Sequence, residues 1–314
     1  MTDAALRLLA LLGRQGTRVL FFAVFIGLAL PDLAALLRPL LPPVVALLLL
    51  TALLRIDWSH LAEVLRRPLL VGLLTAWMLG GSALVAALIL SFLPLPASLE
   101  SGVVLMAAAP PILGAAAIAL LLGLDGALLL VVGLLSTLLT PLTVPPLALL
   151  LLGLELEIGL ADFMLRLGLL VGLSFLVAGF LRQRVGPARL ASWGDRLNGV
   201  IVLLMTVFAI GIMAGVTEQA IADPGRVLLW TAAGFLANPL LQLLGVFVSL
   251  KLGLKRALSV GLATGNCNMG LLLAALPPEG DPGVALFFAL AQLPMYTLPL
   301  AQKRLYAHWL RNKQ

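Results

Sequence analysis

Residues 104–117 read VLMAAAPPILGAAA and place two adjacent prolines, Pro110 and Pro111, near the middle of a long apolar segment. Proline lacks a backbone N–H and clashes with the preceding helical turn, so a helix over this segment is expected to break there. A second segment, residues 261–270, reads GLATGNCNMG and brings glycine and asparagine into another long apolar run. The sequence therefore predicts two apolar segments that are each interrupted partway along.

The composition is that of a protein embedded in lipid. Of the 314 residues, 62% are hydrophobic and 11% are charged, and the mean hydropathy is +1.14. Soluble domains typically carry about 25% charged residues. Apolar blocks long enough to cross a bilayer fill nearly the whole sequence, and they lack the polar alternation of barrel strands. The sequence therefore predicts an all-α polytopic membrane protein with no soluble domain.

Ten transmembrane helices are predicted from the apolar blocks. They cover residues 17–37, 39–54, 68–93, 101–122, 126–153, 160–181, 196–215, 227–250, 256–277 and 283–302. With alternate loops on opposite sides, all 20 lysines and arginines except Arg38, Arg166 and Arg226 fall on one side. The positive-inside rule makes that side cytoplasmic, so both termini are expected in the cytoplasm. The expected location is the bacterial inner (plasma) membrane, with the lipid bilayer as a partner.

Several other classes of protein are not expected. The net charge of +6 comes from basic residues dispersed among short loops, so no nucleic-acid surface is predicted. The single cysteine, Cys267, excludes a disulfide framework and a cysteine-cluster metal site. The histidines, His60 and His308, fall in loop or tail regions, and no GxSxG elbow or P-loop is present. Neither an enzyme nor a bound cofactor is predicted.

The chain repeats some features at an offset of about half its length. Residues 123–126 read GLDG and residues 280–283 read GDPG, and each stretch precedes an apolar helix that ends near a threonine and a proline, at Thr140 and Thr297. The repeats are predicted over residues 1–156 and 157–314, within one membrane-embedded unit. Five helices is an odd number, so the second repeat is expected to be inverted, as in many secondary transporters with a site at mid-membrane.

The interruptions in the fourth and ninth spans are the predicted binding region. Unwound backbone at this depth is tolerated only when it is buried in protein or lines a wet cavity. Half-helix amino ends also present free N–H groups that suit an anion. The alternative is that both interruptions are kinks that serve helix packing. The residues predicted to bind substrate or ion are Pro110, Pro111, Gly114, Thr264, Gly265, Asn266, Cys267 and Asn268.

Polar residues in neighbouring spans are candidates to line the same cavity. These are Thr140, Asn238, Gln242 and Gln292. Asn238 and Gln242 lie one turn apart on one helix face. For Thr140, a hydrogen bond within its own helix is the competing interpretation.

Three stretches resemble the bile acid:sodium symporter family and its wider superfamily of bile acid, arsenite and riboflavin transporters. They are residues 95–110, residues 136–145 and residues 260–271. The resemblance implies two inverted five-helix repeats in which broken helices 4 and 9 cross. It also implies a panel domain of spans 1, 2, 6 and 7 and a core domain of spans 3–5 and 8–10.

The resemblance further implies a secondary transporter that moves a small organic anion by alternating access. Apolar residues and a cysteine occupy most positions where the family holds sodium: Ala115, Ala116, Leu129, Gly133, Ala263 and Cys267. The coupling ion therefore stays open between sodium, a proton and none, with Asn266, Asn268 and backbone groups as other possible ligands. Two alternatives remain: a non-transporting membrane scaffold or sensor, and an efflux carrier of the arsenite type, suggested by the Cys267 thiol.

Overall fold

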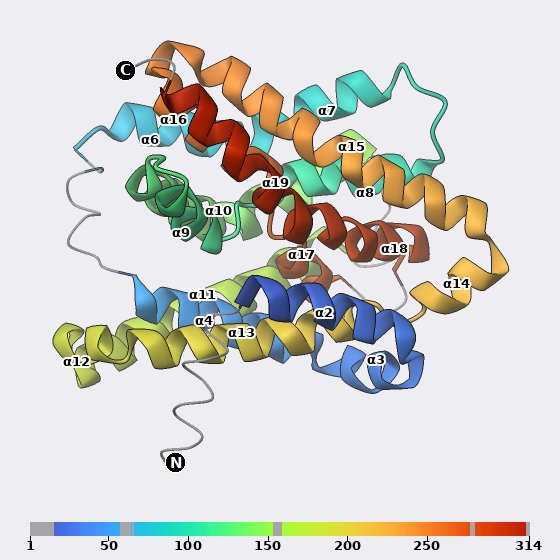
Figure 1. Ribbon diagram of the computed structural model, residues 1–314, viewed down its shortest axis with the longest axis horizontal. Coiled ribbons are helices and arrows are strands. Elements are labelled where there is room, and N and C mark those ends of the chain that lie inside the picture. Colours follow the sequence, from blue (N-terminus) through green and yellow to red (C-terminus); the bar gives the residue numbers. More distant parts are fainter. Residues whose placement is uncertain (1–15, 57–63, 65, 153–158, 277–279, 312–314) are drawn as a thin grey trace. The chain divides into compact units, whose positions relative to one another are not determined.

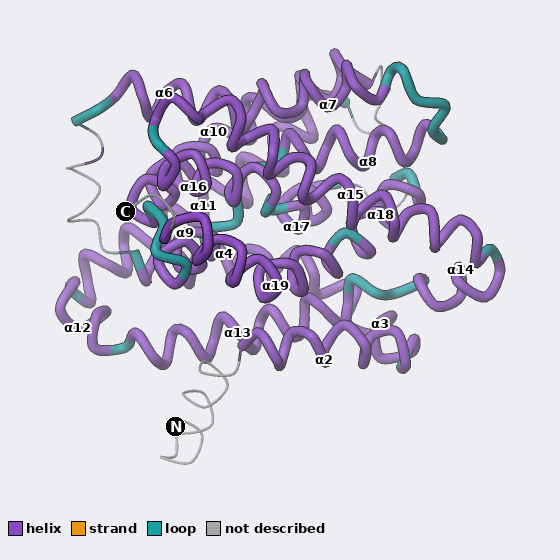
Figure 2. The backbone as a smooth tube through the Cα atoms, turned by 45° about the horizontal axis from the view of Figure 1, so that its top comes forward, coloured by secondary structure: helices purple, strands orange, loops and turns teal. Residues whose placement is uncertain are grey.

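The computed structural model describes residues 16–56, 64, 66–152, 159–276 and 280–311. Within these residues all regular secondary structure is helical, joined by short loops (Figures 1 and 2). The helices of the first half are α2 Gly16–Ala29, α3 Pro31–Leu37, η1 Arg38–Leu40, α4 Leu41–Arg55, α6 Pro68–Ala76, η2 Trp77–Gly81, α7 Ser82–Leu90, α8 Ala97–Ala108, α9 Gly114–Leu121 and α10 Gly126–Leu152. Those of the second half are α11 Leu160–Val185, α12 Pro187–Ser192, α13 Gly194–Gly211, α14 Val216–Ala222, α15 Pro224–Ser249, η3 Leu250–Leu252, α16 Leu254–Gly265, α17 Met269–Ala275, α18 Pro282–Leu290 and α19 Gln292–Arg311.

Six helical segments of the described chain are long and apolar enough to cross a bilayer. They are Pro31–Arg55, Pro68–Leu90, Gly126–Leu152, Leu160–Val185, Gly194–Ala222 and Pro224–Leu252. The other expected spans correspond to the shorter α2 and to helices in two pieces: α8 with α9, α16 with α17, and α18 with α19. The protein is therefore polytopic and helical, whereas ten spans in an inverted repeat remain a prediction.

The first break between helices in the described part of the chain lies earlier than predicted. We expected a loop at Arg38, between spans over residues 17–37 and 39–54, but Arg38 begins the 3-10 turn η1 within a helical segment from Pro31 to Arg55. The break lies instead at Leu30, whose φ is −124° and ψ is 75°. A residue before proline is pushed away from the helical region, and Pro31 fits the first helical position because its missing N–H is not needed there. Thus the expectation for Arg38 was wrong.

A π-helical turn interrupts the third apolar segment. It covers Trp77–Gly81 (η2), between α6 and α7. The Ser82 hydroxyl donates a hydrogen bond to the Ala107 carbonyl at 2.7 Å and also lies 2.9 Å from the Trp77 carbonyl. Ala107 is in the last turn of α8, so Ser82 fixes the π turn against the end of that helix. Such turns occur frequently at functional sites.

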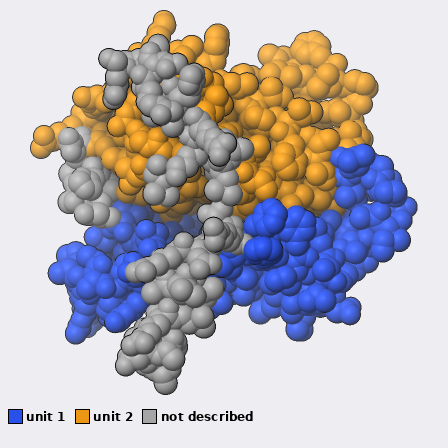
Figure 3. Space-filling view, in the orientation of Figure 1, with its two compact units in different colours: residues 1–56, 169–228 blue, residues 57–168, 229–314 orange. Residues whose placement is uncertain are grey.

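The chain forms two compact units, shown in different colours in Figure 3. Unit 1 comprises Met1–Ile56 and Leu169–Leu228, and unit 2 comprises Asp57–Gly168 and Leu229–Gln314. Unit 1 holds the spans that the resemblance assigns to the panel, apart from residues 160–168, and unit 2 holds those assigned to the core, apart from residues 227–228. Each unit draws on both halves of the chain, so the units differ from the repeats proposed over residues 1–156 and 157–314, which stay a prediction.

Within unit 2, α15 and α16 pack at very short range. A Cβ built on Gly261 would lie 2.6 Å from the Gln242 carbonyl oxygen, and one built on Gly265 would lie 2.6 Å from that of Asn238. Only glycine fits where two backbones approach this closely, and small residues at such contacts are typical of membrane helix pairs. This packing fixes α16 up to the last residue before it breaks.

Candidate functional site

The first interrupted helix ends where the prolines begin. Helix α8 stops at Ala108, and Ala109 takes an extended conformation with φ −68° and ψ 143°. A residue before proline avoids the helical region, and neither Pro110 nor Pro111 can donate a backbone hydrogen bond. The chain becomes helical again at Gly114, the start of α9. Two of the predicted site residues thus form the gap, and Gly114 lies at its far edge.

The second interruption falls within the predicted stretch of residues 264–268. Helix α16 ends at Gly265, and Asn266 leaves the helical region with φ −104° and ψ 74°. Asn268 is the N-cap of α17, and its side-chain oxygen accepts a hydrogen bond from the Leu271 N–H at 3.2 Å. A capping asparagine satisfies one of the free donors at a helix start. The side-chain oxygen of Asn268 is therefore used to cap α17.

The two gaps meet and pair with each other. Pro111 and Cys267 form an isolated antiparallel bridge. The Ile112 N–H donates to the Asn266 carbonyl at 2.9 Å, and the Asn268 N–H donates to the Pro110 carbonyl at 2.7 Å. Buried backbone groups must find partners, and here each broken helix supplies them to the other. The structure thus brings together six predicted residues: Pro110, Pro111, Gly265, Asn266, Cys267 and Asn268.

Asn266 carries an unused hydrogen-bond acceptor in this crossing. Its side chain is fully buried, and its Nδ2 donates to the Leu262 carbonyl at 2.8 Å. Its Oδ1 is also buried but has no partner among the described residues. A buried polar atom without a partner is costly, and each such case calls for an explanation. The Asn266 oxygen is therefore a buried acceptor that the crossing leaves without a hydrogen-bond partner among the described residues.

A chain of buried side chains holds the end of α16 in place. Asn238 Nδ2 donates to the Gly265 carbonyl at 2.7 Å, and Gln242 Nε2 donates to Asn238 Oδ1 at 2.7 Å. Tyr306 completes the chain, since its hydroxyl donates to Gln242 Oε1 at 3.0 Å. Asn238 and Gln242 were predicted to line a cavity. The structure places them at the second gap, where Asn238 bonds to the backbone of α16 and Gln242 bonds to the side chains of Asn238 and Tyr306.

The Tyr306→Phe variant is expected to be less stable than the natural protein by about 1 kcal/mol, the typical net contribution of one hydrogen bond. Gln242 Oε1 would lose its donor while the aromatic packing stays. Thermal unfolding in detergent would measure the change, and Tyr296→Phe, on the same helix, is the matched control. An unchanged unfolding temperature for Tyr306→Phe would show that this hydrogen bond does not stabilise the chain.

Thr264 and Cys267 form local contacts beside the gap. The Thr264 hydroxyl donates to the Val260 carbonyl at 2.9 Å and accepts from Trp77 Nε1 at 3.1 Å. The Cys267 thiol is buried and donates to the Thr264 carbonyl at 3.0 Å.

Sequence reasoning missed Trp77, Ser82 and Tyr306, because nothing local in those stretches indicates that they reach the gaps. Only the glycine pair at 80–81 hints at the irregular π turn.

Thr140 and Gln292 are not among the residues that the described contacts join to the crossing. Thr140 donates to the Ser136 carbonyl at 2.8 Å, and Gln292 donates to the Phe288 carbonyl at 3.2 Å, so each bonds within its own helix. For Thr140 this is the competing interpretation. Ser136 is fully buried in α10, and its hydroxyl has no partner among the described residues.

Most positions at which the resemblance places sodium ligands lie in a buried apolar region of unit 2. Ala115, Ala116, Leu129 and Ala263 all belong to one cluster of buried apolar side chains. Hard cations are held by several oxygen ligands, and these side chains offer none. No group of three or more histidine, cysteine, aspartate or glutamate side chains that could hold a metal occurs in the described part of the chain.

Comparison with known families gives one match. The sequence model of the Sodium Bile acid symporter family matches residues 42–224, which is more than half of the chain. The matched region includes the first gap and most of unit 1 but ends before the second gap. No curated protein matches the chain.

Proposed function

The chain belongs to the sodium bile acid symporter family, and from this premise we propose that it is a secondary transporter that moves a small organic anion by alternating access. Members of this family are membrane transporters and not enzymes. The proposal extends to the bacterial plasma membrane as location, with both termini in the cytoplasm, because the basic residues gather in alternate loops. The ten spans and the inverted repeat are part of the same proposal.

The observation that carries the proposal is the pairing of two gaps deep in unit 2. At the gaps the backbone leaves the helical conformation, and the hydrogen bonds between Ile112 and Asn266 and between Asn268 and Pro110 satisfy groups that lipid could not. Secondary transporters place their substrate sites at such discontinuous helices. A scaffold or sensor would gain nothing from keeping both gaps together with the unpaired Asn266 oxygen.

The anionic group of the substrate is proposed to lie at the amino end of α9. Gly114 begins this helix, is exposed, and has no atom within 4 Å of a built Cβ. The first N–H groups of a helix and its dipole favour negative charge. The Asn266 oxygen is proposed to accept a hydrogen bond from a hydroxyl or amide of the same substrate, or to bind the coupling cation.

The side chains at the family's sodium positions bear on the coupling ion. The buried apolar cluster that contains Ala115 and Ala263 argues against sodium at those positions. Sodium coupling, if present, would have to use oxygens at the gaps, and proton coupling or uncoupled transport needs no such ligands. An arsenite-type mechanism gains no support from Cys267, because its thiol is buried and bonded to the Thr264 carbonyl.

A ligand screen tests the proposal. Purified protein would be heated with a panel of small organic anions, in sodium buffer and separately in potassium buffer. We expect at least one anion to raise the unfolding temperature, because a ligand that binds only the folded state stabilises it. A shift only in sodium would identify the coupling ion. Were no anion to stabilise the protein, and none to be taken up by proteoliposomes in either salt, the transporter proposal would fail.

A further inference from the structure

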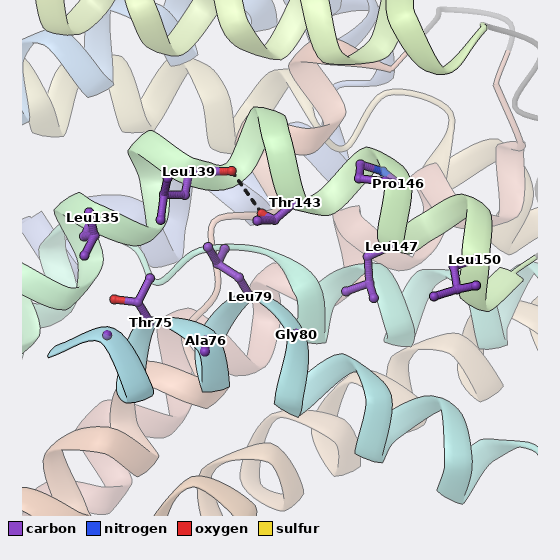
Figure 4. Close-up of a pocket in the computed structure, with 11 residues that line it drawn as sticks. Thr75, Ala76, Leu79, Gly80, Leu135, Leu139, Thr143, Pro146, Leu147 and Leu150 are labelled. Carbon is purple, nitrogen blue, oxygen red and sulfur yellow. Dashed lines mark hydrogen bonds between the residues drawn. The ribbon is translucent and has the colours of Figure 1, made fainter. Parts of the chain in front are cut away.

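Within unit 2, an apolar groove runs between α10 on one side and α6 with the turn η2 on the other (Figure 4). Its volume is about 560 Å³, within the range of roughly 300–1,000 Å³ found for ligand sites. One wall consists of Gly72, Thr75, Ala76, Leu79 and Gly80. The other consists of Leu135, Leu139, Thr143, Pro146, Leu147 and Leu150. No lining residue is charged.

Side-chain size explains why the groove is open. The residues of the first wall follow helical spacing, so they form one stripe on one face. Most of them are small, while the facing stripe of α10 is mainly leucine, and in Figure 4 Leu139 and Leu147 point from α10 toward α6. A Cβ built on Gly72 or on Gly80 meets no atom within 4 Å. The two glycines therefore border empty space and leave it for another molecule to fill.

The groove continues into exposed apolar surface on α6 and α10. Leu69 and Leu73 of α6 are 75% and 62% exposed, and Leu142 and Leu150 of α10 are 62% and 76% exposed. Both helices belong to segments long and apolar enough to span a bilayer. Exposed leucines on a membrane-spanning helix contact lipid chains, so the groove opens toward acyl chains.

One lining side chain indicates that the ligand also carries an oxygen. Thr75 is 4% exposed, and its hydroxyl has no partner among the described residues. Thr143, the other hydroxyl in the lining, already donates to the Leu139 carbonyl at 3.0 Å. A buried hydroxyl without a partner costs free energy. A molecule that fills the groove would remove this cost if it brought an acceptor to Thr75.

We propose that this groove binds one acyl chain of a membrane phospholipid, whose ester oxygen accepts a hydrogen bond from Thr75. The chain lies along the small stripe of α6 against the leucines of α10. The site shares no lining residue with the paired gaps and does not depend on which solute the protein carries. It holds one lipid in place among the exchanging lipids at the protein surface.

Photolabelling in vesicles tests this site. The protein would be reconstituted into phosphatidylglycerol and phosphatidylethanolamine vesicles containing a phospholipid with a diazirine on one acyl chain. After illumination, mass spectrometry would locate the adducts. We expect labelling of residues 72–80 and 135–150 well above that of the exposed α11 leucines Leu165 and Leu169, which report surface lipid. Equal labelling of groove and surface would overturn the proposal.

Substitutions of Gly80 and Thr75, each with a matched control, test whether the labelling comes from a lipid bound in the groove. Gly80→Leu fills the groove from one wall, so its labelling should fall to the surface level, whereas Gly172→Leu, which also adds a side chain into open space, should leave the labelling unchanged. Thr75→Val should reduce occupancy about fivefold, the effect of one hydrogen bond, and Thr75→Ser should restore it. Unfolding temperatures would confirm that each variant folds. Persistent labelling in Gly80→Leu, or displacement by a water-soluble anion, would rule out a lipid site.

Discussion

The Asn266→Ala variant is expected to bind its ligand at least about tenfold more weakly than the natural protein, and to lose transport with it. Asn266 Oδ1 is the buried side-chain acceptor that the crossing leaves without a partner. Removing one hydrogen bond between a buried site and a polar or charged ligand group costs roughly 1.5–3 kcal/mol, which is tenfold or more in affinity. Binding would be measured by titrating the stabilising anion and following the unfolding temperature.

The Asn266→Ala substitution also lowers stability, and this effect must be separated from the loss of ligand affinity. Asn266 Nδ2 also donates to the Leu262 carbonyl at 2.8 Å, so the alanine variant leaves that carbonyl without this bond and lowers stability. Affinity is therefore compared between proteins that are shown to be folded without ligand. Asn198→Ala, in α13 of unit 1, is the matched control and should bind normally. Normal affinity in a folded Asn266→Ala variant would place the binding site elsewhere.

The Gly261→Val variant is expected to lose about 3 kcal/mol of stability or more. A Cβ at this position would lie 2.6 Å from the Gln242 carbonyl oxygen, and a backbone atom inside a helix cannot move aside alone. Overpacking a close interface typically costs 1–3 kcal/mol, and more when the backbone must shift. Because α16 leads directly into the second gap, the same change should also displace the gap from its partner.

The Gly172→Val variant provides the comparison for this result. Gly172 lies within α11, and a Cβ there meets no atom within 4 Å, so the variant should unfold at nearly the natural temperature. Unfolding in detergent would be followed by fluorescence for both variants. Equal stability of the two would mean that α15 and α16 do not approach as closely as described.

Local sequence rules predicted the two helix interruptions but not the hydrogen bonds that stabilise them. The proline pair at 110–111 and the Thr-Gly-Asn-Cys-Asn stretch at 264–268 break helices for reasons contained in those residues. Their pairing was expected from the resemblance, and its hydrogen bonds needed the structure. The hydrogen bond between Tyr306 and Gln242 could not be predicted from the sequence, because contacts between residues far apart in sequence leave no local pattern.

One error shows how an apolar helix hides its boundary. Arg38 looked like a loop because a charged residue between apolar blocks usually marks a span end, yet Pro31 already starts the helical segment that contains it. For Thr140, hydroxyl chemistry alone could not separate a cavity lining from a bond within its own helix. In the structure its hydroxyl bonds within α10.

A disulfide between the two gaps tests the crossing directly. Pro111 and Cys267 face each other in the antiparallel bridge without exchanging backbone hydrogen bonds, since the bonds are made by their neighbours. Pairs of this type have Cα atoms about 4.5 Å apart, within the range of roughly 4.4–6.8 Å that a disulfide spans. The Pro111→Cys variant places a thiol opposite the only natural cysteine of the chain.

Mass spectrometry of the oxidised Pro111→Cys protein, digested without reduction, would show the linked peptides. We expect a cross-link between the introduced thiol and Cys267 that disappears on reduction, whereas Thr143→Cys, in the groove on α10, should leave Cys267 free. A folded Pro111→Cys protein whose two thiols both remain free under a lipid-soluble oxidant would contradict the meeting of the two broken helices.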